Sequence, residues 1–335
     1  MVDIIHGGKL DEAVANFGGD RSKWLDLSTG INPNPYPIGE IPAHCWTDLP
    51  DDQLTREAVS AVLHNAGADE QARVCLAPGA QMIIQTLPFL FKPQSVAVVG
   101  FTYQEHGMCW RRAGHEVYVT DGLESAESTA RIVIVVNPNN PDGRIFDRED
   151  LIGLARRLAA KGGLLVVDES FGDVAPNANM ADETGRDGLL VMRSLGKFFG
   201  LAGLRFGAAL GAKPLVVRLQ ERLGPWAVSG PALWLAAKAM RDDKWQGKTR
   251  KKLAGNREDL EGLLQERGFE IVGGCDLFVL ADHGRSEDLY NHLAEKKILV
   301  RQFPGKSGWL RFGLPGSKPA LRRLDKAING FYEAD

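Results

Sequence analysis

The sequence lacks the features that mark several specialised classes of protein. Its formal net charge is −3, so it has no basic excess of the kind that a nucleic-acid-binding domain normally carries. No stretch approaches the ~18 consecutive apolar residues of a membrane helix, and the acidic first residues contain no apolar run typical of a signal peptide. We therefore expect a cytoplasmic protein with no membrane or nucleic-acid partner.

Motifs for metal, nucleotide and acyl-enzyme chemistry are also missing. The four cysteines are scattered, with no CxxC pair and no zinc-ligand spacing, which favours free thiols in a reducing compartment and no metal site. The Gly-Lys-Thr and Gly-Lys-Ser strings at 247–249 and 305–307 lack the first glycine of a P-loop. No G-x-G-x-x-G follows a predicted strand, and H-E-x-x-H and G-x-S-x-G are absent.

Short apolar runs alternate with helical patterns in the middle of the chain. The runs at 96–99, 132–136 and 164–167 are β-branched or aliphatic and end at turn or polar residues, as strands buried on both faces do. A helical pattern at 150–161 separates the last two runs. Such alternation predicts right-handed βαβ units and a mostly parallel sheet.

The two ends of the chain do not share this pattern. Three prolines in 33–37 exclude a helix or a central strand, because proline fixes φ and removes a donor, so an extended arm is expected. After about Lys213, long helical segments precede short strands near 276–280, 298–301 and 309–312. We predict an α/β protein in three parts. These are an N-terminal arm (1–50), a large domain with a mostly parallel central sheet flanked by helices (51–212), and linking helices with a smaller α+β domain (213–335).

Three polar residues follow predicted strands of the central sheet, where ligands bind in open α/β proteins. Asn140 follows the run at 132–136, Asp168 ends the run at 164–167, and Lys197 follows a further apolar run at 189–192. Taken singly, the aspartate fits a helix cap and the lysine an exposed surface position. However, Lys197 lies in a string of apolar and glycine residues, where an amine loses solvation and becomes a nucleophile toward carbonyls. Ser194 and Arg205 flank it and could hold a phosphate.

These strings resemble the signatures of the class I/II aminotransferases, which are pyridoxal-phosphate (PLP) enzymes of fold type I. The segments at 137–143 (NPNNPDG), 167–171 (VDESF) and 194–207 occur in the family's order and at similar spacing. The resemblance implies a Schiff-base lysine at Lys197, a pyridine-nitrogen partner at Asp168 and a donor to the ring 3-oxygen at Asn140. It also implies that Tyr103 stacks on the cofactor ring and that Arg311 binds the substrate carboxylate. The cofactor phosphate would be bound by Gly79, Ala80, Gln81, Ser194 and Arg205.

Two positions depart from the family pattern. Phe171 stands where a tyrosine is usual, so the ring oxygen loses one donor and depends more on Asn140. Leu49 stands where a tyrosine often reaches the cofactor phosphate of the partner subunit. Because family active sites are built at a dimer interface, the resemblance implies a homodimer, with the proline-rich segment 32–37 as a strap across it.

The N-terminal region resembles, more narrowly, the threonine-phosphate decarboxylases of cobalamin biosynthesis. The strings HGG at 6–8 and DLSTGINP at 26–33 carry this resemblance, with further agreement at 49–52, 77–81, 102–106 and 225–226. It implies L-threonine O-3-phosphate as the substrate. The phosphate would meet His6, Gly7, Gly8 and Arg301, the carboxylate would meet Arg311, and Asn32 and Asn140 would complete the substrate site.

Two alternatives remain open at this point. Histidinol-phosphate aminotransferases share the cofactor and a phosphorylated amino substrate, and a reaction with 2-oxoglutarate would favour them. A protein of this fold that only senses or carries a ligand belongs to a different class. The presence of Lys197, Asp168 and Arg311 argues against that class, because a carrier does not need this set of reactive groups.

Overall fold

The computed structural model describes residues 7–68 and 71–333, which form two compact units. The large unit comprises residues 35–140 and 145–245, and the small unit comprises the chain up to Asn34, residues 141–144 and the chain from Gln246. The domain boundaries predicted at residues 50 and 212 stay predictions beside this division by contacts. Within the described ranges, no helix is both long and apolar enough to cross a bilayer.

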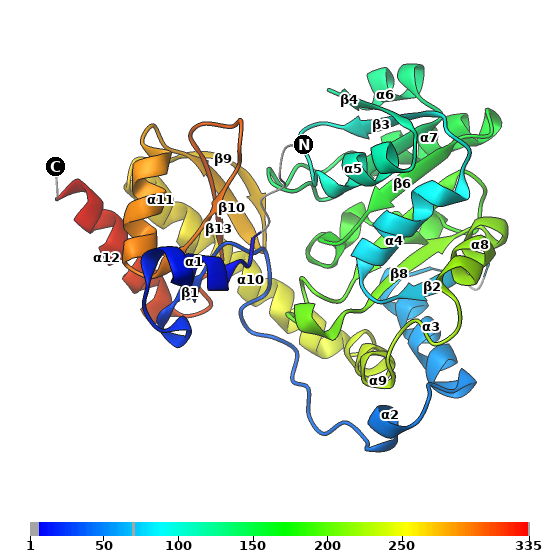
Figure 1. Cartoon of the computed structure of the whole chain (residues 1–335), viewed down its shortest axis with the longest axis horizontal. Coiled ribbons are helices and arrows are strands. Elements are labelled where there is room, and N and C mark those ends of the chain that lie inside the picture. The colour runs from blue at the N-terminus through cyan, green and yellow to red at the C-terminus, as the bar shows by residue number, and fades with distance from the viewer. Residues whose placement is uncertain (1–6, 69–70, 334–335) are drawn as a thin grey trace. The chain divides into compact units, whose positions relative to one another are not determined.

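The large unit is built on a seven-stranded sheet (Figure 1). Its strands lie in the order β2 (Arg73–Ala77), β8 (Gly207–Gly211), β7 (Leu189–Ser194), β6 (Leu164–Asp168), β5 (Ile132–Val136), β3 (Ser95–Val99) and β4 (Glu116–Thr120). The strands from β7 to β4 run parallel, whereas β8 is antiparallel to both of its neighbours. The mostly parallel sheet is therefore confirmed, and β3, β5 and β6 lie where the apolar runs predicted strands.

The helices of the large unit pack around this sheet. They are α2 (His44–Thr47), α3 (Asp52–Ala66), α4 (Ala80–Thr86), α5 (Glu105–Arg112), α6 (Leu123–Thr129), α7 (Arg148–Ala160), α8 (Lys213–Leu223) and α9 (Gly230–Ala239). The helix predicted at 150–161 begins two residues earlier, because the Asp147 carboxylate accepts hydrogen bonds from the amides of Glu149 and Asp150. Short 3-10 helices complete the unit: η2 (Leu87–Leu90), η3 (Gly172–Val174), η4 (Pro176–Ala178), η5 (Ala181–Glu183) and η6 (Ala202–Leu204).

Strand β8 has no counterpart among the predicted strands. Its sequence, GAALG, has small residues and little β propensity, yet all five residues are buried. The reason is tertiary, since a Cβ atom on Gly207 would overlap the backbone nitrogen of Ala80. Small residues in β8 thus let the first turn of α4 pack directly on the sheet.

The small unit is an α+β structure. An antiparallel sheet has the order β12 (Arg301–Gln302), β13 (Trp309–Gly313), β10 (Phe278–Asp282) and β9 (Glu270–Cys275). A separate parallel pair joins β1 (Leu25–Asp26) to β11 (Ile298–Leu299). The unit also contains η1 (Arg21–Lys23) and four helices: α1 (Leu10–Phe17), most of α10 (Asp243–Glu266), α11 (Ser286–Glu295) and α12 (Lys318–Tyr332). The strand predicted at 298–301 is therefore divided between β11 and β12.

Candidate active site

Asp168 ends strand β6 and is the most enclosed of the predicted catalytic groups. Its side chain is buried, and its Oδ1 accepts hydrogen bonds from the Ser170 amide at 2.9 Å and the Ser170 hydroxyl at 2.5 Å. Its Oδ2 lies 2.8 Å from Nε2 of His106, on α5. Burial alone would raise the pKa of Asp168, but the hydrogen bonds from His106 and Ser170 outweigh it and hold that pKa below its usual value. The site therefore contains a buried carboxylate that stays ionised.

Lys197 and Asn140 follow the two strands that neighbour β6. Strand β6 pairs with β5 on one side and with β7 on the other, and all three run parallel, so their carboxyl ends meet at one edge of the sheet. Lys197 follows β7 and is half-buried, and its Nζ lies 5.4 Å from the centroid of the Phe171 ring. Asn140 follows β5, whose end is joined to β6 by a 2.9 Å bond from the Asn137 amide to the Asp168 carbonyl. The fold brings all three predicted residues to one edge.

The residues predicted to hold a phosphate converge at the start of α4. Ser194, Gly207 and Ala77 are partners across β7, β8 and β2, which places the Ser194 end of β7 close to the turn that begins α4. Gly79 has φ +88°, and a Cβ atom there would lie 2.5 Å from Nη2 of Arg205. Arg205 itself is exposed. A glycine, a guanidinium and the amides of a helix start form a cradle that suits an anion.

Tyr103 and Gln81 are linked to each other and to α5. The Tyr103 hydroxyl donates to Oε1 of Gln81 at 3.1 Å, and Nε2 of Gln81 donates to Glu105 at 3.0 Å. The Tyr103 ring meets His106 edge-on, with centroids 6.1 Å apart. Residues 103–106 therefore contact two elements: Tyr103 bonds Gln81 at the start of α4, and His106 bonds Asp168 at the end of β6.

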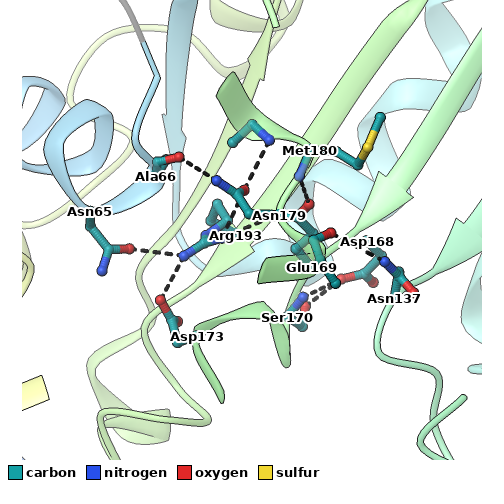
Figure 2. Close-up of polar contacts among 12 residues, drawn as sticks. Asn65, Ala66, Asn137, Asp168, Glu169, Ser170, Asp173, Asn179, Met180 and Arg193 are labelled. Carbon is teal, nitrogen blue, oxygen red and sulfur yellow. Dashed lines mark hydrogen bonds and ion pairs between the residues drawn. The ribbon is translucent and has the colours of Figure 1, made fainter. Parts of the chain in front are cut away.

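A buried ionic cluster lies directly beside Asp168 (Figure 2). Arg193, on β7, forms ion pairs with Glu169 at 2.8 Å and with Asp173 at 2.6 Å, and all three side chains are almost fully buried. The guanidinium also donates to Asn65 at 3.0 Å, and Glu169 accepts from the Met180 amide at 2.6 Å. Burial, with a smaller contribution from the Asp173 carboxylate, raises the pKa of Glu169 to about 7 despite the opposing charge of Arg193.

The small unit contains the predicted anion-binding residues. Arg301 and Arg311 are directly opposite each other across β12 and β13. Arg311 is buried, its guanidinium lies 4.9 Å from the Phe278 ring centroid, and Nη2 donates to the Ser28 carbonyl at 2.9 Å. Burial, and then the neighbouring charge of Arg301, lowers the pKa of Arg311 to about 9. Two like charges held face to face favour an anionic ligand.

The N-terminal glycines lie against the same segment as Arg311. The Gly8 amide donates to the Ser28 hydroxyl at 2.8 Å, and a Cβ atom on Gly7 would overlap the Ser28 carbonyl oxygen. Asn32 is buried, and its Oδ1 accepts from the Asn34 amide at 2.9 Å, closing a local turn. His6, predicted beside these glycines, lies outside the described residues.

Sequence reasoning assigned no role to several residues that the fold places at these sites. His106 entered only as one letter of the 102–106 string, and Glu169, Asp173 and Arg193 were not singled out. A signal for His106 was its place three residues after Tyr103, a predicted cofactor contact, on the first turn of α5. For Arg193 the signal was a cation within an otherwise apolar strand.

Comparison with known proteins identifies the family. The family model described as "Aminotransferase class I and II" matches residues 47–328. A threonine-phosphate decarboxylase of Pseudomonas aeruginosa is 41% identical over 334 residues, which cover 98% of each chain. A second, from Sinorhizobium sp, is 41% identical over 330 residues and 97% of each chain. Histidinol-phosphate aminotransferase 1 of Trichormus variabilis is 27% identical, covering 85% of this chain and 86% of that protein.

Solved structures agree with this result at the level of the fold. The L-threonine-O-3-phosphate decarboxylase from Porphyromonas gingivalis has a TM-score of 0.75 at 22% identity, covering 92% of this chain and 99% of its own. The histidinol-phosphate aminotransferase from Sinorhizobium meliloti, in complex with pyridoxal-5'-phosphate, has a TM-score of 0.81 at 17% identity, covering 99% and 96%. The fold expected from the motifs is thereby confirmed. By the family model, and by two relatives similar along nearly its whole length, this chain belongs to the class I and II aminotransferase family.

Proposed function

We propose that this protein is a PLP-dependent decarboxylase that converts L-threonine O-3-phosphate to (R)-1-amino-2-propanol O-2-phosphate and CO2, a step of cobalamin biosynthesis. The observation that carries the proposal is 41% identity, over nearly the whole chain, to two threonine-phosphate decarboxylases. Histidinol-phosphate aminotransferase is the second candidate, favoured by the shared fold. However, the histidinol-phosphate aminotransferases of Trichormus variabilis and Vibrio vulnificus are only 27% and 31% identical to this chain.

The groups of the large unit fit the chemistry of PLP. Asp168 is an ionised, buried carboxylate at a strand end, which suits a protonated ring nitrogen. Lys197 offers an amine beside the Phe171 ring, and Gly79 with Arg205 offers a cradle for a phosphate. When bound, the cofactor supplies a protonated ring that accepts the electron pair released at the substrate Cα.

Each residue of the large unit then has a defined task. Lys197 holds the cofactor covalently before the reaction and afterwards delivers a proton to the substrate Cα. Asp168 binds the ring nitrogen, and Tyr103 packs against the ring. Asn140 donates to the 3-oxygen, where Phe171 has no hydroxyl to offer. Ser194, Arg205 and the amides at Gly79, Ala80 and Gln81 bind the cofactor phosphate.

The small unit supplies the groups that suit the substrate's two anions. Arg311 binds the carboxylate, because a planar guanidinium offers two parallel donors to it. Arg301 and the segment 6–8 bind the phosphate, and Asn32 supports that segment. The opposed positions of Arg301 and Arg311 on β12 and β13 support this division, since each cation then has its own anion.

Two anchors also decide which bond breaks. With PLP bound, the bond that would break at Cα is the one that the protein's anchors present to the cofactor. An aminotransferase presents the Cα–H bond in this way, whereas a decarboxylase must present the carboxylate. With its carboxylate on Arg311 and its phosphate on Arg301, the substrate cannot rotate freely about N–Cα, and such positioning contributes several kcal/mol to catalysis.

We also propose that the protein works as a homodimer in the cytoplasm. Large apolar side chains are exposed on the large unit at Trp46, Leu49, Met82, Phe89 and Trp226. Met82 and Phe89 line one surface hollow and Trp226 lines another, and both hollows share Leu223 and Ala227. An apolar area of this kind supports burial against a second copy. The four buried, unpaired cysteines support a reducing compartment.

A direct assay tests the function. Purified protein is incubated with PLP and L-threonine O-3-phosphate, and CO2 and aminopropanol phosphate are measured; parallel reactions contain histidinol phosphate with 2-oxoglutarate. We expect CO2 and aminopropanol phosphate in equal amounts, without need for 2-oxoglutarate. Transamination of histidinol phosphate without decarboxylation of threonine phosphate would reject the proposal in favour of the second candidate. Sedimentation of the same sample at micromolar concentration tests the dimer, and a fully active monomer would contradict it.

A further inference from the structure

The turn that joins β12 to β13 carries an aromatic residue that the proposed mechanism does not use. Residues 303–306 read Phe-Pro-Gly-Lys, and the Lys306 amide donates to the Phe303 carbonyl at 3.1 Å. Gly305 has φ +79°, so proline and glycine stand at the two central positions that favour them in a type II turn. This turn holds Phe303 directly after β12, two residues from Arg301.

The Phe303 ring lies beside both arginines of the proposed substrate site. The guanidinium carbon of Arg301 is 5.4 Å from the ring centroid, and that of Arg311 is 6.0 Å from it. An aromatic face carries partial negative charge and attracts a cation within about 6 Å. Because Arg301 and Arg311 are opposite each other across β12 and β13, their side chains leave the same face of the sheet. One ring thus attracts two cations that repel each other.

Phe278 shows how an aromatic residue of the core differs from Phe303. Phe278 is fully buried in β10, and its ring centroid lies 4.9 Å from the guanidinium carbon of Arg311. Burial in the core is enough to explain a large apolar side chain at that position. Phe303 is only half-buried and lies in a turn. Its contacts with both Arg301 and Arg311 are therefore the feature that sets it apart.

The first residue of β13 contacts the ring of Phe303. Trp309 meets that ring edge-on, with centroids 6.5 Å apart and an angle of 82° between the planes. Edge-to-face contacts of this kind are favourable for aromatic pairs. Lys306 completes the arrangement, since its Nζ lies 4.9 Å from the centroid of the Trp309 ring. The turn fixes the backbone of Phe303 and Trp309 fixes its ring, so the ring is in place before any ligand binds.

We propose that Phe303 is a positioning residue that determines specificity: by attracting both Arg301 and Arg311, it keeps their guanidiniums close enough to bind two anions of one small substrate. This inference deepens the proposed function and rests on the substrate assigned there, which carries a carboxylate on Cα and a phosphate on the neighbouring Cβ. Both cations must therefore stay close together. Burial and Arg301 lower the pKa of Arg311 to about 9, which shows that the site opposes a second cation.

The proposal predicts different effects on ligands with one anion and with two. A ligand with two anions gains from both arginines only while their spacing matches its own, because the second contact depends on an effective concentration set by that spacing. Without the ring, Arg301 and Arg311 can move apart. A ligand with one anion can still bind to either of them, so its affinity should fall less.

Two variants of Phe303 test this difference. Phe303→Leu removes the aromatic face and keeps an apolar side chain, whereas Phe303→Tyr keeps the ring. The probes are 3-phosphooxypropionate, which has both anions of the substrate but no amine that could react, and inorganic phosphate. Calorimetry with the purified protein and PLP measures their dissociation constants. We expect Phe303→Leu to bind 3-phosphooxypropionate about 3- to 10-fold more weakly, the size of a lost cation–π contact, with KM for threonine phosphate raised by a similar factor. Its affinity for phosphate, and both affinities of Phe303→Tyr, should stay within about two-fold of the parent.

A double variant tests whether Phe303 acts through Arg301. In an Arg301→Ala background, Phe303→Leu should weaken binding of 3-phosphooxypropionate by less than about two-fold more, because the pair that the ring holds is gone. Phe269→Leu is the control, since the Phe269 ring packs against His283 and Phe312 in the same unit. It should lower thermal stability and leave probe binding unchanged.

Several results would overturn the inference. They are equal losses for the two probes in Phe303→Leu, the same loss in Phe303→Tyr, effects that multiply in the double variant with Arg301→Ala, and a parent that binds 3-phosphooxypropionate no more tightly than phosphate. The probe measurements need no turnover. A parent that binds 3-phosphooxypropionate tightly but fails the decarboxylation assay would therefore reject the proposed reaction and leave the two-anion site standing.

Discussion

The two units arrange their charged side chains differently. In the large unit every buried cation or carboxylate near the strand ends has an opposite or hydrogen-bonding partner: Asp168 has His106 and Ser170, and Arg193 has Glu169 and Asp173. In the small unit Arg301 and Arg311 face each other as like charges, and the pKa of Arg311 falls to about 9. The large unit thus pairs opposite charges beside its strand ends, while the small unit sets two cations side by side, an arrangement that supports the proposed role of binding an anion.

The largest effect is expected from removing the one reactive amine of the large unit. Lys197→Ala should lower decarboxylation by at least about 10³-fold, since by the proposed mechanism the residue both holds the cofactor and transfers the proton. Borohydride should bleach the parent protein and leave the cofactor on a peptide containing Lys197. Lys161→Ala, which changes an exposed lysine, should behave like the parent. Cofactor found on another lysine would contradict the assignment.

The comparison is tested most directly by removing one arginine from each unit. Arg193→Met leaves Glu169 and Asp173 buried without their cation, so we expect unfolding to become easier by about 3–5 kcal/mol. Arg311→Met removes a cation that burial and the neighbouring Arg301 already disfavour, so we expect a smaller loss of stability than for Arg193→Met, together with loss of the proposed contact with the substrate carboxylate. Chemical denaturation of both variants measures this. Equal destabilisation would show that the contrast between the units is false.

The anion-binding role of the small unit predicts a smaller, kinetic effect. Arg301→Ala should raise KM for threonine phosphate about 10- to 100-fold, the effect of losing a hydrogen bond between charged groups. The ratio of decarboxylation to transamination should also fall, because the substrate can then rotate about N–Cα. Gln302→Ala, at the next position of β12, is the control. An unchanged rate and KM in Arg301→Ala would remove Arg301 from the phosphate site.

The smallest effect concerns the pH dependence of stability in the large unit. The pKa of Glu169 is raised from its unfolded value of about 4.5 to about 7, so the folded state holds a proton that the unfolded state has already lost. Stability from this group is therefore complete below about pH 4.5 and is lost as the pH rises through about 7. Relative to Glu169→Gln, the parent should lose on the order of 1–3 kcal/mol between pH 5 and 7.5 in urea denaturation. Parallel curves would contradict this shift.

Local sequence patterns were sufficient for much of the large unit. The apolar runs that form β3, β5 and β6 are buried on both faces. Each strand could therefore be predicted from its own residues, without knowledge of the strands beside it. The polar residues after them reached one edge of the sheet because parallel strands end on the same side. Helix α12 (Lys318–Tyr332) also depends on local signals, since Ser317 caps it and its buried residues Leu324, Ala327, Ile328 and Phe331 form an apolar stripe.

Elements whose stability comes from distant partners were not predictable in the same way. Strand β4 is the edge of the sheet and mostly exposed, and its apolar run, at 117–119, is only three residues long. Strand β8 is made of small residues because α4 packs on it, a contact between positions 127 residues apart. Neither feature leaves a periodic signal along the chain.

The sequence by itself determined the family, the central strands and the residues at their ends, because these depend on local hydrophobic patterns and short motifs. Only the tertiary structure decided which groups hold those residues in place. His106 meets Asp168 across 62 positions, Arg193 meets Glu169 across 24, and Arg301 faces Arg311 through the register of β12 and β13. Hydrogen bonds and ion pairs of this kind depend on how close two segments lie in space. A pattern read along the chain does not contain the distance between segments that are far apart in sequence.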